Sequence, residues 1–279
     1  MAERCSTLRR GRRRIEFVPA VPPELAARWL ASWEGLFGPG RRPVPGLPAK
    51  EDLARADEPL GPVVFKRERF SGLGALARRF RLRRTRAARA FALGRAMEAA
   101  GVPTPAPLAV VRSPAGRAGF ATGLVTRFLA GGGPWEAVAR PGGDPEKILQ
   151  ALAEAIAALH RAGFRHRDLK APNLLVTEEE PGRPAVWFLD LDGAARCLAP
   201  PGPATTRRDL SRLAASFASA PARAAGVGPA YWLAFVARYL AARRGAPAAE
   251  KEVVRLAAAT ARVAARRIAH HERTGRPLA

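Results

Sequence analysis

One ordered stretch constrains this chain more than any other. Residues 166–173 read His-Arg-Asp-Leu-Lys-Ala-Pro-Asn, and the apolar triplet Leu-Leu-Val follows directly. A second acid, Asp190, comes at the end of the apolar run 186–189 and opens the sequence Asp-Leu-Asp-Gly. Short apolar runs of this kind are typical of buried strands. The order therefore predicts a short rigid loop that carries Asp168 and Asn173, held against a core by strands, with Asp190 at a strand end.

These residue types suit phosphoryl transfer. An acid can accept the proton of a hydroxyl, while an amide oxygen and a carboxylate suit Mg²⁺ bound to ATP. The stretch resembles the catalytic loop of the protein-kinase-like superfamily, in which these positions occur in this order. The resemblance implies that Asp168 is the catalytic base, that Asn173 and Asp190 bind Mg²⁺, and that Lys170 contacts the γ-phosphate. His166 and Arg167 are expected to organise the loop.

A second lysine fits the same interpretation. Residues 62–66 (Pro-Val-Val-Phe-Lys) predict a strand that ends in Lys66. This lysine resembles the strand lysine of kinases that binds the α- and β-phosphates of ATP. Only five of the 47 basic residues are lysines, so a lysine at this position is informative.

Two features depart from the kinase pattern. The segment before this strand contains only Gly61, so the glycine-rich loop that covers ATP in many kinases is missing. The helix predicted at 83–100 offers a single acid, Glu98, as partner for Lys66. In addition, Asp192 stands where many kinases have glycine. It is a candidate second metal ligand, or the metal ligand in place of Asp190.

The order of predicted elements indicates an α+β, two-lobed protein-kinase-like fold. Residues 46–128 are expected to form an N-terminal lobe with a small antiparallel sheet and one helix, and residues 129–279 a mostly helical C-terminal lobe. Residues 1–45 are basic and rich in proline and are interpreted as a lead-in. Further elements are expected as strands at 108–112 and 120–128 and as helices at 145–162, 229–243 and 248–271.

Composition limits the partners. The formal charge is +23, and residues 69–97 contain nine arginines and no acid. Such a face attracts anionic lipid, nucleic acid or phosphorylated sugar, although a solvated helix face with an arginine-rich coding bias is the alternative. The two cysteines make neither a disulfide framework nor a zinc site, and no apolar run reaches membrane-spanning length. We expect a cytoplasmic monomer that can associate with the inner face of the cytoplasmic membrane and that has no nucleic-acid partner.

The spacing after the second acid bears on the acceptor. Asp209 follows Asp190 by only 19 positions, and the interval lacks the activation loop and peptide platform of a protein kinase. A small molecule, sugar or glycolipid is the expected acceptor. Asp209 is expected to begin a helix and to hold the loop from below.

A closer resemblance follows from several ordered pieces. They look like the lipopolysaccharide core kinase family, which includes Kdo and heptose kinases, and they lie at residues 63–70, 89–111, 123–131, 159–176, 187–194 and 207–216. The resemblance implies ATP-dependent phosphorylation of an inner-core sugar on a lipid A-bearing acceptor, at the cytoplasmic face of the inner membrane.

Three alternatives stay open on the sequence alone. A protein Ser/Thr kinase would share the loop motif, and an aminoglycoside-type phosphotransferase would share the fold. A basic ATP-binding scaffold without catalysis is the third. The missing glycine-rich loop favours the scaffold, while the presence of Asp168, Asn173 and Asp190 argues against it.

Overall fold

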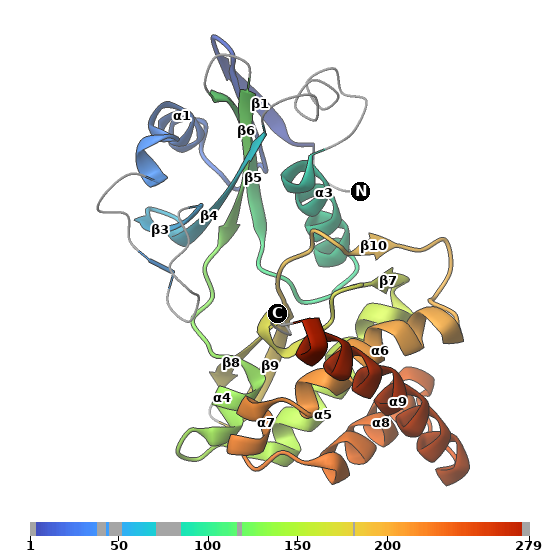
Figure 1. Cartoon of the computed structure of the whole chain (residues 1–279). Coiled ribbons are helices and arrows are strands. Elements are labelled where there is room, and N and C mark those ends of the chain that lie inside the picture. The colour runs from blue at the N-terminus through green and yellow to red at the C-terminus, as the bar shows by residue number, and fades with distance from the viewer. Residues whose placement is uncertain are drawn as a thin grey trace. The chain divides into compact units, whose positions relative to one another are not determined.

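The computed structural model describes residues 4–37, 43–44, 52–70, 85–115, 119–180 and 182–274. The chain divides into two compact units (Figure 1). The N-terminal unit comprises Met1–Ala99 and Pro105–Leu129, and the C-terminal unit comprises Ala100–Thr104 and Ala130–Ala279. The division at 129/130 lies one residue from the lobe boundary that the sequence suggested.

The N-terminal unit is built on a six-stranded antiparallel sheet in the order β1-β2-β5-β6-β4-β3. The strands are β1 (Ser6–Arg10), β2 (Arg13–Phe17), β3 (Leu53–Glu58), β4 (Gly61–Phe70), β5 (Pro107–Ala115) and β6 (Gly119–Arg127). Helix α1 (Pro23–Ser32) and the short 3₁₀ helix η1 (Gly35–Phe37) follow β2, and helix α3 (Arg86–Ala99) precedes β5. An antiparallel sheet with helices packed on it agrees with the expected α+β class.

Strands β1 and β2 are where the structure differs most from the domain limits suggested by the sequence. The first 45 residues were interpreted as a lead-in, yet β2 pairs with β5 and so belongs to the sheet. Ile15 and Phe17 of β2 are buried in the core, while a run of arginines directly precedes them. Because the arginines dominate the composition, the two-residue alternation of a half-buried strand is hard to see in this segment.

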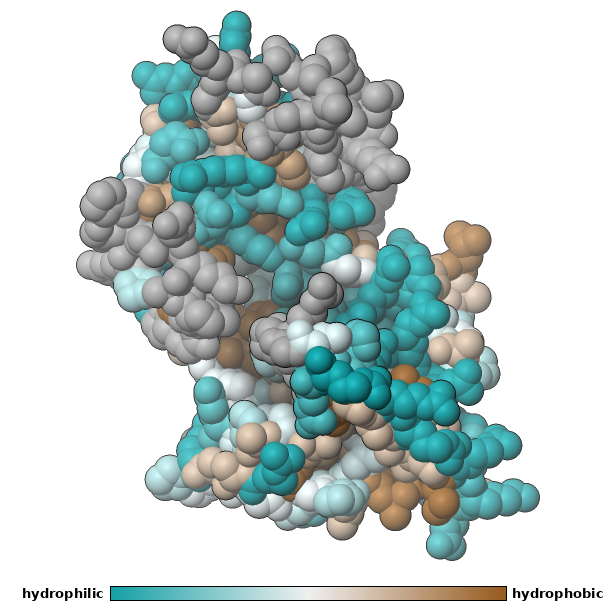
Figure 2. Space-filling view, in the orientation of Figure 1, coloured by the Kyte–Doolittle hydropathy of each residue, from teal (hydrophilic) through white to brown (hydrophobic). Residues whose placement is uncertain are grey.

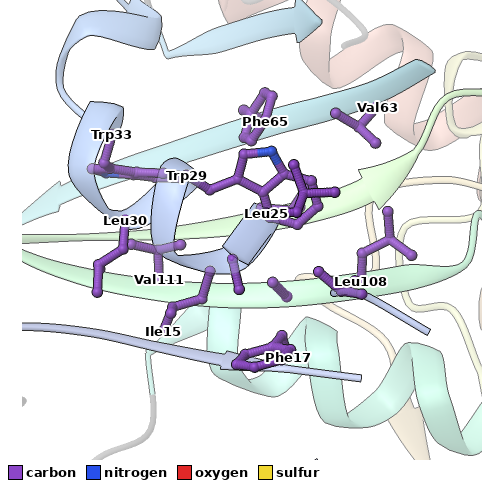
Figure 3. Packing of buried hydrophobic residues seen from close by; sticks show 14 of the residues in the cluster. Ile15, Phe17, Leu25, Trp29, Leu30, Trp33, Val63, Phe65, Leu108 and Val111 are labelled. Atoms are coloured by element: carbon purple, nitrogen blue, oxygen red, sulfur yellow. The ribbon is translucent and has the colours of Figure 1, made fainter. Parts of the chain in front are cut away.

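The core of this unit lies between the sheet and α1. Trp29 of α1 and Trp33, which caps the C-terminal end of this helix, pack edge-on against Phe65 of β4 (Figure 3). Both indole rings are almost completely buried, at 1% and 0% exposure. The buried side chains of α3, among them Phe91 and Met97, are not part of this cluster, and α3 instead packs on β5 and β6. The two helices therefore stabilise the sheet through separate clusters.

The C-terminal unit is mostly helical. It contains α4 (Pro134–Ala139), α5 (Pro145–Arg161), β7 (Phe164–Arg165), η2 (Ala171–Asn173), β8 (Leu174–Glu180), β9 (Arg183–Phe188), β10 (Ala195–Arg196), α6 (Pro203–Phe217), α7 (Ala220–Ala224), α8 (Pro229–Arg244) and α9 (Glu250–Thr274). β8 pairs with β9, and β7 pairs with β10, both antiparallel. The helices expected from the sequence at 145–162, 229–243 and 248–271 are therefore present, with ends shifted by one to three residues.

Helix α5 shows why these segments are helical. The Asp144 carboxylate accepts hydrogen bonds from the backbone N–H groups of Glu146 and Lys147, which caps the helix, and Pro145 occupies its first position. Ile148, Leu152 and Ile156 recur at helical spacing and are buried. Helix α5 packs against α8, and α6 packs against α9. This packing fixes the ends of α5 and α6, between which the 166–173 segment lies.

The surface carries few apolar side chains. Figure 2 shows hydrophilic residues over much of the coloured part of the face in view, with smaller apolar patches among them. Among the described residues, the exposed large hydrophobic side chains are Leu198, Leu233 and Val254. None of the described helices has the length and apolarity to cross a membrane. Residues 71–84, which hold much of the arginine-rich segment, lie outside the described residues.

We predict that Gly123→Ala destabilises the N-terminal unit. A methyl group at this position of β6 would overlap the Trp33 ring and press on the backbone oxygen of Lys66. Trp33 cannot move aside easily, because its ring packs between Phe37 and Phe65. Overpacking of this kind costs about 1–3 kcal/mol, and urea unfolding will measure it.

Gly35→Ala is the matched control, since a methyl group at Gly35 meets no atom within 4 Å. We expect its free energy of unfolding to stay within about 0.5 kcal/mol of the wild type. Equal stability of the two variants would contradict the packing described for Gly123.

Candidate active site

A buried carboxylate holds the 166–173 loop in place. Asp209 of α6 accepts hydrogen bonds from the backbone N–H groups of His166, at 2.8 Å, and Arg167, at 2.9 Å. Arg167 has a backbone φ of 65°, a left-handed conformation that costs a non-glycine residue about 1–3 kcal/mol. The two hydrogen bonds offset that strain. The expectation that Asp209 holds the loop from below is confirmed. The expectation that it begins a helix is wrong, because α6 starts at Pro203 and Asp209 lies nearly two turns inside it.

The charge of Asp209 is stabilised in its buried position. Burial alone acts to raise the pKa of this carboxyl, whose side chain is only 1% exposed. His160, through its hydrogen bonding and charge, and the two backbone donors of the loop act in the opposite direction and lower the pKa overall. The Nε2 atom of His160 lies 3.5 Å from Oδ2 of Asp209, and its Nδ1 atom lies 2.8 Å from the Tyr239 hydroxyl. Asp209 is therefore a carboxylate at neutral pH.

His166 connects the loop to the end of β9. Its Nε2 atom lies 2.9 Å from the backbone oxygen of Leu189. Because a carbonyl oxygen only accepts, Nε2 carries the proton. Burial lowers the pKa of this imidazole below its ordinary value of 6.5. A neutral, buried histidine that is hydrogen-bonded to the Leu189 backbone organises the loop, as the sequence suggested.

Asn173 and Asp190 lie at the same end of the β8–β9 ladder. Leu174 pairs with Phe188, and the backbone N–H of Leu189 donates a hydrogen bond to the backbone oxygen of Asn173 at 2.9 Å. Asp190 follows directly with a left-handed φ of 52°, which turns the chain away from the strand direction. Two segments separated in the sequence thus bring an amide and a carboxylate close together.

Asp168 is the most contacted side chain of the loop. Its Oδ2 atom accepts a hydrogen bond from Nδ2 of Asn173 at 3.1 Å and lies 3.3 Å from Nζ of Lys170. Its Oδ1 atom lies 2.7 Å from a guanidinium nitrogen of Arg212. The carboxylate is 34% exposed. The structure therefore brings Asp168, Lys170 and Asn173 together, with Asp190 at the adjoining strand end.

Arg212 is a site residue that the sequence reading missed. It stands three residues after Asp209 on α6, so both side chains project from nearly the same face of the helix. The sequence Arg-Arg-Asp-Leu-Ser-Arg at 207–212 could have predicted this contact. If Asp209 holds the loop, its neighbours on the same helical face lie close to the loop as well.

Lys66 and Glu98 lie in the N-terminal unit. Lys66 stands within β4 rather than at its end, between Leu53 of β3 and Leu124 of β6. Strand alternation places it on the face opposite Phe65, where it is partly buried. Glu98 is exposed in the last turn of α3, and no ion pair joins it to Lys66 in the part of the chain that the structure describes.

A different ion pair connects α3 with β4. Arg86, the first residue of the helix, lies 3.3 Å from Glu68, two residues after Lys66. The helix therefore supplies a cation and the strand an acid, the reverse of the Lys66–Glu98 arrangement. Both groups are partly exposed, so this pair adds little to stability.

The donors in the C-terminal unit fit a magnesium–nucleotide group. The amide nitrogen of Asn173 donates to both the backbone and side chain of Asp168, so its oxygen Oδ1 is the atom left for a cation. Asp190 adds an exposed carboxylate. Mg²⁺ prefers oxygen ligands and keeps water and phosphate in its shell, so two protein ligands suffice. Clusters of three or more His, Cys, Asp or Glu are absent from the described residues.

Comparison with solved structures defines the class of fold. A structure titled "WaaP in complex with acyl carrier protein" matches with a TM-score of 0.55 and 20% identity, covering 88% of this chain and 97% of that chain. A structure of vaccinia related kinase 3 matches at 14% identity, covering 68% and 51%, with a TM-score of 0.36. The fold is protein-kinase-like, as the sequence predicted. No curated protein sequence matches significantly.

The family follows from the sequence model. Residues 71–239 match the lipopolysaccharide kinase (Kdo/WaaP) family, and the chain belongs to that family. It is accordingly a phosphotransferase that acts on a sugar hydroxyl in lipopolysaccharide biosynthesis, and a kinase of this family implies ATP as donor. The family resemblance noted in the sequence is confirmed.

We predict that Asp209→Asn destabilises the C-terminal unit at neutral pH by about 1–3 kcal/mol. An amide oxygen can replace one of the two acceptors for His166 and Arg167, but the amide N–H₂ would face the other donor. Because the folded pKa of Asp209 is lowered, its contribution is present above pH 3.8 and is lost as the pH falls through the folded value. Urea unfolding at several pH values measures the difference.

Asp144→Asn is the matched control. Asp144 also accepts two backbone N–H groups, but at an exposed helix start where asparagine caps as well as aspartate. We expect its stability to stay close to that of the wild type. A loss as large as that of Asp209→Asn would argue that the buried contact is not special.

Proposed function

We propose that this chain is an ATP- and Mg²⁺-dependent kinase that phosphorylates a hydroxyl of an inner-core sugar, Kdo or heptose, on a lipid A-bearing acceptor. The main support is the loop itself. Asp168, Lys170 and Asn173 lie within contact distance of one another on a loop that Asp209 holds, in a chain of the lipopolysaccharide kinase family.

Asp168 is the proposed catalytic base. It orients the acceptor hydroxyl and accepts its proton as the oxygen attacks the γ-phosphorus of ATP, while the bond from that phosphorus to the β,γ-bridging oxygen breaks and ADP leaves. Asn173 and Arg212 hold the two carboxylate oxygens in fixed directions, which limits the reorientation needed at the moment of reaction. Lys170, next to the same carboxylate, is placed to offset the negative charge of the transferred phosphoryl group.

Asn173 and Asp190 are the proposed metal ligands. Mg²⁺ held there would neutralise phosphate charge and orient the γ-phosphate. Asp192, two residues further on and partly buried, remains the alternative ligand. Lys66 is proposed to contact the α- and β-phosphates, and Glu98 is the weaker candidate, since it is exposed and not paired with Lys66 within the described chain.

The path from Asp190 to α6 favours a sugar over a peptide acceptor. After Asp190 the chain forms the two-residue strand β10 beside β7 and enters α6 at Pro203. Among these residues, all of which the structure describes, no extended segment is present to bind a peptide. We propose that the enzyme acts at the cytoplasmic face of the inner membrane, where a net charge of +23 would favour contact with an anionic surface.

We predict that Asp168→Asn abolishes most transfer, by roughly 10²- to 10⁴-fold in kcat, because a neutral amide cannot accept the proton. The affinity for Mg-ATP should stay unchanged. ATP turnover with a Kdo–lipid A extract measures the first quantity, and calorimetry the second. Glu154→Gln, at an exposed position of α5, is the control and should retain full turnover. Wild-type turnover that no such acceptor stimulates would overturn the sugar-kinase proposal.

We predict that Asp190→Ala removes the Mg²⁺-dependent part of ATP binding, because the carboxylate ligand is lost. ATP affinity is measured by calorimetry in Mg²⁺ and again in EDTA. Asp192→Ala serves as the matched variant and should keep the Mg²⁺ effect. The opposite pattern would assign the metal to Asp192.

A further inference from the structure

We propose that Arg212 and Arg267 form a binding site for an anionic group, a carboxylate or a phosphate, of the acceptor beside Asp168. This inference rests on the proposed function and deepens it. It requires that the reacting hydroxyl belong to a molecule that carries a negative group a few ångströms away.

The two arginines come from different helices of the C-terminal unit. Arg208 and Arg212 stand one turn apart on α6, and Arg267 stands on α9. The helices pack against each other, and Ala264, one turn before Arg267, is buried. Arg212 reaches Oδ1 of Asp168 at 2.7 Å, and each of these two side chains is 34% exposed. Arg212 therefore stands at the rim of the loop, partly open to solvent, and Arg267 is partly buried.

The charges in this cluster do not balance. Asp168 is a single carboxylate in contact with both Lys170 and Arg212. Burial lowers the pKa of Arg267, the charges of Arg212 and Arg208 lower it further, and Asp168 is the acid that acts against them. Two cations thus contact Asp168, and Arg267 lies within electrostatic range of Arg212, Arg208 and the same carboxylate; a bound anion would relieve the repulsion among the arginines.

Arg212 also retains hydrogen-bonding capacity. Its Nε atom is buried and has no hydrogen-bond partner among the described residues. A buried donor without a partner is costly and points to a group that the protein alone does not provide. The forked guanidinium matches two oxygens of a carboxylate or phosphate at once, which a lysine would not.

A purely structural role explains the position of Arg212 but not that of Arg267. Arg212 alone suffices to orient Asp168, since it makes the short contact. That function leaves the partly buried Arg267 beside two like charges unexplained. An acceptor anion explains both residues, because it would bind between the two helices while its neighbouring hydroxyl faces Asp168.

The test compares Arg212→Gln and Arg267→Gln with Arg266→Gln. Arg266 is the adjacent, exposed residue of α9, so its variant has the same change in net charge. The probe is a de-O-acylated Kdo–lipid A fragment, titrated by calorimetry without nucleotide. We expect the Kd to rise about 10- to 100-fold for the first two variants and to change little for the third. Unchanged affinity in both, or equal loss in all three, would overturn the proposal.

Two modified fragments identify the source of the anion. One has its Kdo carboxyl groups reduced to alcohols, and the other has its lipid A phosphates removed. With the fragment that lacks the recognised group, Arg212→Gln and Arg267→Gln should have the same Kd as the wild type, as expected for a direct contact. An effect of the same size with both modified fragments would contradict direct anion binding.

Kinetics separates substrate binding from an indirect action through Asp168. Arg267→Gln should raise KM for the acceptor while kcat stays close to the wild-type value. A fall in kcat with unchanged KM would instead mean that Arg267 only supports the loop, and would overturn the site. Urea unfolding verifies that each variant folds. If Arg212→Gln does not fold, the comparison of Arg267→Gln with Arg266→Gln decides the proposal.

Failure of this inference can be told from failure of the proposed function. Wild-type protein that binds the fragment but transfers no phosphate to it would refute the proposed reaction, while the variant Kd values would still decide the anion site. Wild-type protein that phosphorylates the acceptor with equal KM in all variants would leave the reaction standing and refute the anion site.

Discussion

The C-terminal unit depends on the two hydrogen bonds from the loop backbone to the buried carboxylate of Asp209. They satisfy a charge that would otherwise be costly to bury, and they hold Arg167 in a conformation that an unsupported chain would rarely adopt. The direction of Asp168, the next residue, follows from that turn. The helix that supplies Asp209 also supplies Arg212, so a single element sets both the path of the loop and the orientation of its acid.

The far end of the loop is fixed by strands instead of a helix. Asn173 and Leu189 form the last hydrogen bond of the β8–β9 ladder, and His166 adds a contact from its ring to Leu189. Every group that orients Asp168 is therefore set by regular structure. Such rigidity suits catalysis by preorganised charges, since the donors need not move as charge develops.

Local patterns in the sequence predicted much of this site. Asp168, Lys170 and Asn173 lie within six residues, and the apolar runs around Asp190 predicted its strand. The parts that could not be predicted depend on contacts distant in sequence. Arg267 lies near the arginines of α6 because α9 packs on α6, and β1 and β2 join the sheet through a partner some ninety residues away. Glu98 was chosen as the only acid on its helix, and its part as the partner of Lys66 stays a prediction.

The charge of the N-terminal segment has a consequence for the open edges of the sheet. β1 forms one edge and carries Arg9 and Arg10 exposed, while β3 forms the other and carries Arg55, Asp57 and Glu58. Unpaired strand edges invite other chains to add to them, and charged side chains oppose that addition. The arginines that make β1 hard to recognise in the sequence thus also oppose the pairing of this edge of the sheet with strands of other molecules.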